Sequence, residues 1–186
     1  DFGKINTNWK FLIENFIEPY HVQFVHKTTT NQPLKDHYTF VDGKCYGSGI
    51  DVEKEDAKNG SALSVTSRYL SLFPNFIIGT YFPNQVGVYL NIPISPGVTS
   101  QKRIIYTTDS KEMTKKEIQT TKDIWWSVHK EDHEICERLQ EGRSSPASHS
   151  GGLLSPIWEK GVQAFQKLII NSINKSFKIK RRVKNV

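Results

Sequence analysis

Cysteine is scarce in this sequence. Only Cys45 and Cys136 occur among its 186 residues, too few for a disulfide framework and too far apart for a local cysteine-based metal knuckle. Such sparse cysteine is typical of a reducing compartment, and we expect a cytoplasmic protein. Stability must therefore come from a hydrophobic core, which a chain that is 37% hydrophobic and 11% aromatic can form as a single domain.

Long apolar runs are missing as well. No stretch is long enough to span a bilayer and no signal peptide is recognisable, so we expect no membrane association. Acidic residues are absent from 175–186, a segment with six Lys or Arg. Removing these six from the 25 basic residues leaves 19, which equals the number of acidic residues. We interpret 175–186 as a solvated basic tail and expect no nucleic-acid partner; contact with nucleic acid or a membrane is the minority alternative.

Residues 8–26, NWKFLIENFIEPYHVQFVH, combine an amphipathic helix with two histidines. Apolar residues recur there at spacings of three and four and predict one buried helical face: Trp9, Leu12, Ile13, Phe16, Ile17 and Tyr20. His21 and His26 follow this face, and imidazole is a common ligand of transition metals. Residues five apart on a helix point about 140° from each other. The two histidines can therefore share a metal only across a bend, which Pro19 could cause; otherwise they are ordinary, partly buried histidines.

Residues 110–142 predict a second long helix, because apolar residues recur at helical spacing up to Gly142, a residue type that commonly ends helices. These residues are Ile118, Trp125, Val128, Ile135 and Leu139. Asp132 lies within about 20° of Trp125 and Leu139 around the helix axis, so its carboxylate should point toward the core. A buried carboxylate is costly unless it is paired or binds a metal. We therefore expect Asp132 to form an ion pair or to ligate a metal.

The same helix offers an alternative metal site. His129 and His133 are four residues apart, as in H-E-x-x-H zinc proteases. Lys130 stands where that motif has its general base, which argues against this alternative. His133 points about 100° away from Asp132 and is expected to face solvent. Glu131 and Glu134 fall on the polar side of the helix, where they need no partner.

The two helical segments together resemble a known family. The pattern N-W-K, E-N, E-P-Y-H and a final H in 8–26, and E-D-x-x-I-C-E-x-x-Q-x-G in 131–142, resemble the catalytic domain of Rieske-type aromatic-ring-hydroxylating oxygenase alpha subunits. The resemblance implies that His21, His26 and Asp132 hold one mononuclear non-haem Fe(II) ion. In the family, the third ligand is an aspartate far downstream of the two histidines, and the second motif places that role on Asp132.

Three more polar residues are expected near these ligands. Asn15, in the E-N pair, and His129, which is nearer the buried face than His133, are candidates to contact the ligands. Glu18 precedes His21 by three residues, so one helical turn can bring its carboxylate close. In the family, the matching acid bridges an iron-ligating histidine to a cluster-ligating histidine of a neighbouring subunit, which implies a catalytic role in electron transfer for Glu18. Most members carry Asp at this position, and the longer Glu keeps the charge.

The resemblance also implies parts that this chain does not contain. A Rieske [2Fe–2S] cluster needs two cysteines and two histidines, with each cysteine closely followed by its histidine, and neither Cys45 nor Cys136 has one in reach. We therefore expect residues 1–174 to be the iron-binding catalytic domain, followed by the basic tail, with the cluster-bearing N-terminal domain absent. Electrons would come from NAD(P)H through a reductase, with or without a ferredoxin, and the full-length protein would be a homotrimer.

The function that the resemblance implies is oxygenation. Family members use Fe(II) and O2 to hydroxylate or dealkylate small organic substrates, and both aromatic and quaternary-amine substrates fit the motifs, as do mono- and dioxygenation. An alternative of a different class is a non-enzymatic helix-grip domain that carries an apolar small molecule. A carrier would have no use for His21, His26 and Asp132 together, so metal analysis separates the two.

The rest of the chain predicts an α+β fold. Six strand-like runs are expected to form an antiparallel meander: His37–Val41, Lys44–Val52, Ala62–Leu72, Phe76–Phe82, Val86–Ile94 and Arg103–Thr108. Asp42-Gly43 indicates a hairpin between the first two runs, and the charged residues 53–60 indicate another turn.

A last helix is expected to begin with Ser155 as its N-cap and Pro156 at its first position. Its predicted apolar face consists of Trp158, Val162, Phe165, Leu168, Ile169 and Ile173. A long C-terminal helix on a curved antiparallel sheet resembles the helix-grip fold, which is also the fold of the family's catalytic domain. Such a fold encloses a cavity. Aromatic residues of the strands either line it or form plain core, and we assign none to substrate: Phe73, Phe76, Tyr81, Phe82 and Tyr89.

Overall fold

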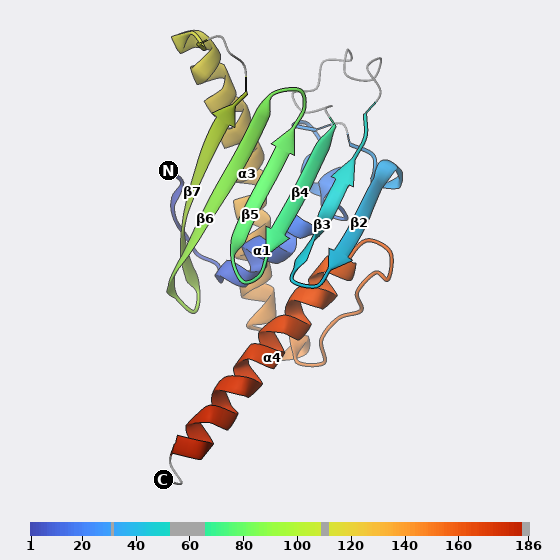
Figure 1. Ribbon diagram of the computed structural model, residues 1–186, viewed down its shortest axis with the longest axis vertical. Helices are drawn as coiled ribbons and strands as arrows, with labels where there is room; N and C mark the ends of the chain where they lie inside the picture. The colour runs from blue at the N-terminus through green and yellow to red at the C-terminus, as the bar shows by residue number, and fades with distance from the viewer. Residues whose placement is uncertain (31, 53–65, 109–111, 184–186) are drawn as a thin grey trace.

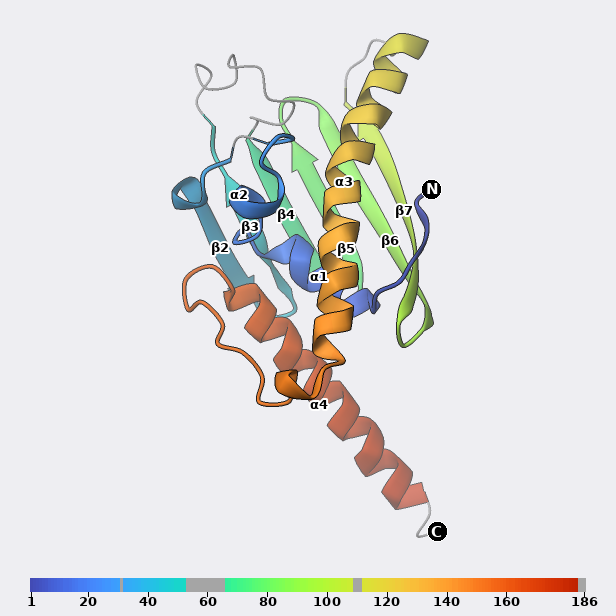
Figure 2. The ribbon, with the colours of Figure 1, turned by 180° about the vertical axis from the view of Figure 1, so that it is seen from behind.

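The structure is a computed structural model that describes residues 1–30, 32–52, 66–108 and 112–183. Seven strands form one antiparallel sheet in the order β1-β7-β6-β5-β4-β3-β2. They are β1 (Gly3–Ile5), β2 (His37–Asp42), β3 (Cys45–Ile50), β4 (Ser67–Leu72), β5 (Phe76–Tyr81), β6 (Gln85–Ser95) and β7 (Val98–Thr107). The long helices lie together on one face of this sheet (Figures 1 and 2). They are α1 (Trp9–Ile17), α3 (Lys115–Arg143) and α4 (Lys160–Val183), and a short α2 (Val22–Val25) follows α1.

The predicted α+β class and the meander of strands are confirmed, because β2 to β7 each pair with the next strand. Two details of the sheet were wrong. The first strand, β1, was not predicted, since three residues carry no readable alternation; it pairs with β7 through Gly3 and Gln101. The last strand begins at Val98 rather than Arg103, because it pairs with β6 from the turn onward.

The predicted hairpin between β2 and β3 is present. Asp42 pairs with Cys45, so the connecting residues are Gly43 and Lys44. Gly43 has a φ of 58°, a value that glycine adopts at little cost. The turn predicted at 53–60 and the predicted strand start at Ala62 lie outside the described residues.

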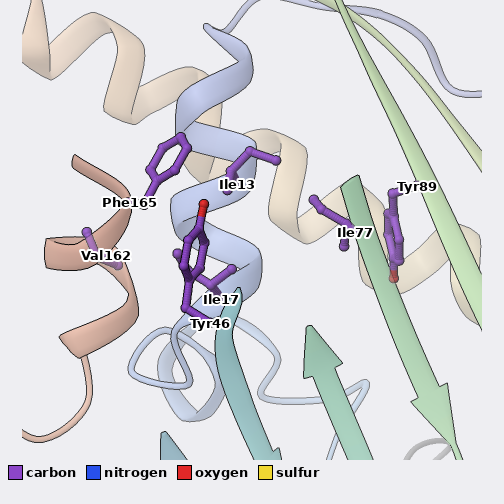
Figure 3. Close-up of a cluster of buried hydrophobic side chains, with 7 residues drawn as sticks. All are labelled: Ile13, Ile17, Tyr46, Ile77, Tyr89, Val162 and Phe165. Carbon is purple, nitrogen blue, oxygen red and sulfur yellow. The ribbon is translucent and has the colours of Figure 1, made fainter. Parts of the chain in front are cut away.

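A buried cluster joins the sheet to α1 and α4 (Figure 3). Its members are Ile13, Ile17, Tyr46, Ile77, Tyr89, Val162 and Phe165. Phe165 is completely buried, and its ring lies 5.9 Å from that of Trp9 and 6.0 Å from that of Tyr46, measured between centroids. This packing fixes the position of α1, the helix that leads into the histidine segment.

The last helix begins later than predicted. Ser155 does cap a turn, since its hydroxyl accepts the N–H groups of Ile157 and Trp158, but α4 starts only at Lys160. The predicted apolar face also ends early, because Ile173 is 50% exposed. Figures 1 and 2 show the reason: only the first part of α4 lies against the sheet, and the rest runs away from it.

The face of α3 that is buried differs from the prediction. Trp125 and Val128 are buried as expected, together with His129 and Cys136. The predicted positions Ile118, Ile135 and Leu139 are exposed. The helix begins after Thr114, whose side chain forms a capping box with Glu117, whereas the predicted start at Ser110 lies outside the described residues. Among the described helices, none is long and apolar enough to cross a membrane.

Candidate metal centre

The chain bends between α1 and α2. A bend at this point is what His21 and His26 need if they are to share one metal ion. Helix α1 ends at Ile17, and Pro19, two residues later, is fully buried. His21 and His26 then flank α2 as its N-cap and C-cap residues. Their ring centroids lie 5.2 Å apart. The bend therefore brings the two imidazoles together. Tyr20, predicted to lie on the buried face, is exposed in the bend instead.

Asp132 reaches the two histidines from α3. Its Oδ1 atom lies 3.1 Å from Nε2 of His26 and 3.6 Å from Nε2 of His21. The side chain of Asn15 donates a hydrogen bond of 2.8 Å to the same oxygen. One donor atom from each of the three residues lies within 4.8 Å of the others, and the described part of the chain has no second His, Cys, Asp or Glu cluster of this kind. His21, His26 and Asp132 are thus able to hold one metal ion.

Each imidazole also contacts a carboxylate through its other nitrogen. Nδ1 of His21 donates to Oε1 of Glu18 at 2.6 Å, and Nδ1 of His26 donates to Oε2 of Glu131 at 2.8 Å. Because Nδ1 of each ring is engaged by a carboxylate, Nε2 is the atom that can bind a metal beside Asp132 once it carries no proton. The expectation that Glu131 needs no partner was wrong. Only the contact between α2 and α3 brings it to His26.

The alternative zinc pair on α3 is not assembled. Nε2 of His129 accepts a 2.7 Å hydrogen bond from Arg103, and Nε2 of His133 bonds to Gln101 at 2.7 Å. His133 is therefore partly buried rather than solvent-facing. Nδ1 of His129 lies 3.5 Å from Oδ2 of Asp132, which places His129 beside the three-residue cluster.

Burial and charge act against each other at the cluster. Burial alone lowers the pKa of His26, but the charges of Asp132 and Glu131 outweigh it and raise that pKa to about 9. Burial alone raises the pKa of Asp132, but His26, His129 and His21 hold it well below its usual range. Burial lowers the pKa of His129 to about 4. A metal ion that binds here must therefore displace a proton from His26, so its binding should weaken at acidic pH.

A cavity opens beside the cluster, with a volume of about 60 Å³, which holds several water-sized groups. Aromatic side chains from α1, the sheet and α3 form much of its wall: Phe16, Tyr69, Tyr81, Tyr89 and Trp125. Of the five aromatic candidates from the sequence, Tyr81 and Tyr89 line this cavity. Phe73 packs against Phe165, and Phe76 and Phe82 are exposed.

Comparison with known families agrees with this arrangement. Residues 3–174 match the family of ring-hydroxylating alpha subunits, in the part described as the catalytic domain. The chain belongs to this family. The match confirms the resemblance drawn from the two motifs, and it extends over both helical segments and the sheet between them.

Curated relatives of this catalytic domain include chloroplastic choline monooxygenases. The sequence is 29% identical over 163 residues to the enzyme of Atriplex hortensis, covering 87% of this chain and 36% of that protein. It is 26% identical over 172 residues to the enzyme of Amaranthus tricolor, covering 91% and 38%. The chain therefore spans less than two fifths of the length of these relatives.

Solved structures of Rieske oxygenases share the fold. The quaternary ammonium Rieske monooxygenase CntA superposes with a TM-score of 0.72 at 19% identity, over 89% of this chain and 46% of that chain. Pseudomonas putida CBB5 NdmA, solved with caffeine, gives a TM-score of 0.62 at 17% identity, over 88% and 48%. At these identities the likeness establishes the fold of the catalytic domain.

Proposed function

We propose that this domain binds one Fe(II) ion through His21, His26 and Asp132 and is the oxygenating centre of a Rieske-type enzyme. The observation that carries the proposal is that one possible ligand atom from each of His21, His26 and Asp132 lies within 4.8 Å of the others, at the motif positions that the family uses. Two imidazoles and one carboxylate form a set typical of non-haem Fe(II) oxygenases, and they leave coordination positions open. Bound iron supplies the oxidising chemistry with O2.

The chain's own residues orient the proposed ligands and form a cavity beside them. Glu18 and Glu131 hold the Nδ1 protons of the two histidines, which fixes their tautomers and makes Nε2 a better ligand. Asn15 holds Oδ1 of Asp132. The cavity with its aromatic wall can hold a small organic molecule beside the cluster.

The substrate we propose is a small aromatic or quaternary-amine compound, which the enzyme hydroxylates or dealkylates. The faces of aromatic rings attract quaternary ammonium groups, and Phe16 and Tyr69 present such rings to the cavity. The names of related proteins point in the same direction, since they include choline and quaternary ammonium monooxygenases.

Electron supply is proposed to come from outside this chain. A Rieske [2Fe–2S] cluster on a further domain would receive electrons from NAD(P)H through a reductase, with or without a ferredoxin, and Glu18 would link His21 to the cluster of a neighbouring subunit in a homotrimer.

The catalytic domain is proposed to occupy 1–174, although α4 continues to Val183 and so carries the start of the basic tail. Both cysteines are free, which fits the proposed cytoplasmic location; the choline monooxygenases are named as chloroplastic.

Iron analysis of the purified chain tests the metal site. We expect about one iron per chain, and strong loss of iron in His21→Ala, His26→Ala and Asp132→Ala, with circular dichroism unchanged, because each removes one ligand. His149→Ala and Asp123→Ala are matched controls, since both residues are exposed on the described chain and outside the cluster. Full iron retention in Asp132→Ala would refute the assignment of Asp132 as a ligand. A chain that contains no iron but binds apolar molecules would favour the alternative of a non-enzymatic carrier.

A further inference from the structure

Arg103 lies next to His129, on the side of that ring away from Asp132. Its guanidinium carbon is 3.5 Å from the ring centroid of Trp125. On the sheet side it rests on Gly87 of β6, where an added Cβ atom would lie only 2.8 Å from Nη2 and 2.9 Å from Nε. Trp125 and Gly87 thus bound the guanidinium group on two sides.

The hydrogen bonding of Arg103 is uneven. Its Nη1 atom donates to Nε2 of His129 at 2.7 Å. Its Nε and Nη2 atoms are buried and have no hydrogen-bond partner among the described residues, and no carboxylate pairs with it in that part of the chain. A buried guanidinium group is costly. Its charge also contacts the rings of Tyr81, Tyr89 and Trp125. The bond to His129 is its one side-chain hydrogen bond among the described residues.

That contact determines which nitrogen of His129 carries the proton. A guanidinium group can only donate, so Nε2 of His129 must accept, and the proton of the neutral ring is on Nδ1. Nδ1 lies 3.5 Å from Oδ2 of Asp132. The other oxygen, Oδ1, faces His21 and His26. Each oxygen of Asp132 therefore has its own set of partners.

We propose that Arg103 is a positioning residue of the iron site. By holding Nε2 of His129 as an acceptor, it directs the Nδ1–H of His129 toward Oδ2 of Asp132, which leaves Oδ1 as the oxygen presented to the metal. This inference rests on the proposed iron site. Arg103 then controls the orientation of the Asp132 carboxylate through His129, as residues that contact metal ligands commonly do.

The direct test is the ¹⁵N NMR spectrum of the histidine side chains in the metal-free chain. We expect Nε2 of His129 to be unprotonated in the wild type and its signal to move in Arg103→Met, because the donor is lost while a side chain of similar length still packs between Trp125 and Gly87. Arg103→Lys keeps a donor and should restore much of the wild-type signal. A protonated Nε2 in the wild type, or an unmoved signal in Arg103→Met, overturns the inference.

A second pair of variants guards against simple misfolding. Gly87→Ala keeps every hydrogen-bonding group but pushes the guanidinium group away, so it should move the His129 signal in the same direction as Arg103→Met. Gly97→Ala, where an added Cβ meets no atom within 4 Å, should leave it unchanged. If the His129 signal is the same in Gly87→Ala and Gly97→Ala, the position of Arg103 has no role in setting the tautomer.

Titration with Co(II), followed by its visible absorption, connects the tautomer to the metal. We expect Arg103→Met to weaken Co(II) binding by about 10- to 100-fold, as is usual when an outer partner of a ligand is lost, and Arg103→Lys to weaken it less. Unchanged affinity in Arg103→Met overturns the inference. A wild-type chain that binds no Co(II) and no iron would instead refute the proposed metal site, while the NMR comparison still decides whether Arg103 sets the tautomer of His129.

Discussion

Nδ1 of His26 and Oε2 of Glu131 lie 2.8 Å apart, across 105 residues of chain. Thr29 donates to the same carboxylate oxygen at 2.5 Å, so Glu131 is held from two sides. Together with the contact between His21 and Glu18, this gives both imidazoles of the cluster a carboxylate partner. The proposed metal site therefore has two further acids beside it that are not among its proposed ligands.

The first prediction concerns Glu131. In Glu131→Gln the neutral amide is a weaker partner for the Nδ1–H of His26, and we expect Fe(II) or Co(II) affinity to fall by about 10- to 100-fold. Metal titration of the purified chain measures this. Glu134→Gln is the matched control, because Glu134 is exposed and pairs only with Arg138 in the described structure. Equal affinities in the two variants would show that the contact with Glu131 does not matter for binding.

The second prediction separates iron binding from electron supply at Glu18. In the full-length enzyme, Glu18→Gln should keep its iron and lose most NAD(P)H-driven turnover, because the amide is a poorer link between two histidines. Hydrogen peroxide brings oxygen and electrons together, so product formation from peroxide should persist. Iron, NAD(P)H-driven product and peroxide-driven product are measured side by side. Loss of the iron, or of both activities, would make Glu18 a support of His21 alone.

The third prediction is a pH dependence of stability that arises from His37. This side chain is buried, its Nδ1 donates to the carbonyl of Pro33 at 3.1 Å, and its Nε2 has no partner among the described residues. Burial lowers its pKa, so the unfolded chain binds this proton more readily, and the folded state loses stability as the pH falls below about 6.5.

Urea unfolding at about pH 7.5 and at about pH 5.5, on either side of the ordinary histidine pKa, measures this effect. His37→Asn retains a donor for the Pro33 carbonyl and cannot be protonated, so its loss of stability between the two values should be smaller than that of the wild type. An equal loss in both proteins would assign the acid sensitivity to other groups.

The fourth prediction tests the core that positions α1. Phe165 is completely buried against rings from α1 and β3, and Phe165→Ala should lower the free energy of unfolding by about 3 to 5 kcal/mol. Phe177 on the same helix is 62% exposed, and Phe177→Ala should change it by less than about 0.5 kcal/mol. Chemical denaturation of both variants measures the difference, and a similar loss of stability in the two would contradict the burial of Phe165 against α1 and β3.

Sequence alone determined much of this protein. Apart from β1 and α2, the order of helices and strands follows from periodicity and local chain chemistry, which act over a few residues. The hairpin at Gly43, the bend near Pro19 and the inward position of Asp132 follow from the same local effects. The two motifs also identified the family, because the spacing of their polar residues is specific. Glu18 was expected near His21 for the same local reason, as the two are three residues apart.

Tertiary structure decided which side chains meet. The contacts of Glu131 with His26 and of Arg103 with His129 join distant parts of the chain, and no local period reports them. Packing also explains why three residues of α3 that were predicted to be buried are exposed: Ile118, Ile135 and Leu139. The buried face of α3 is set by the helix and sheet that pack against it rather than by hydrophobicity alone. Contacts between distant residues depend on how whole elements pack, and that is settled only when the fold is complete.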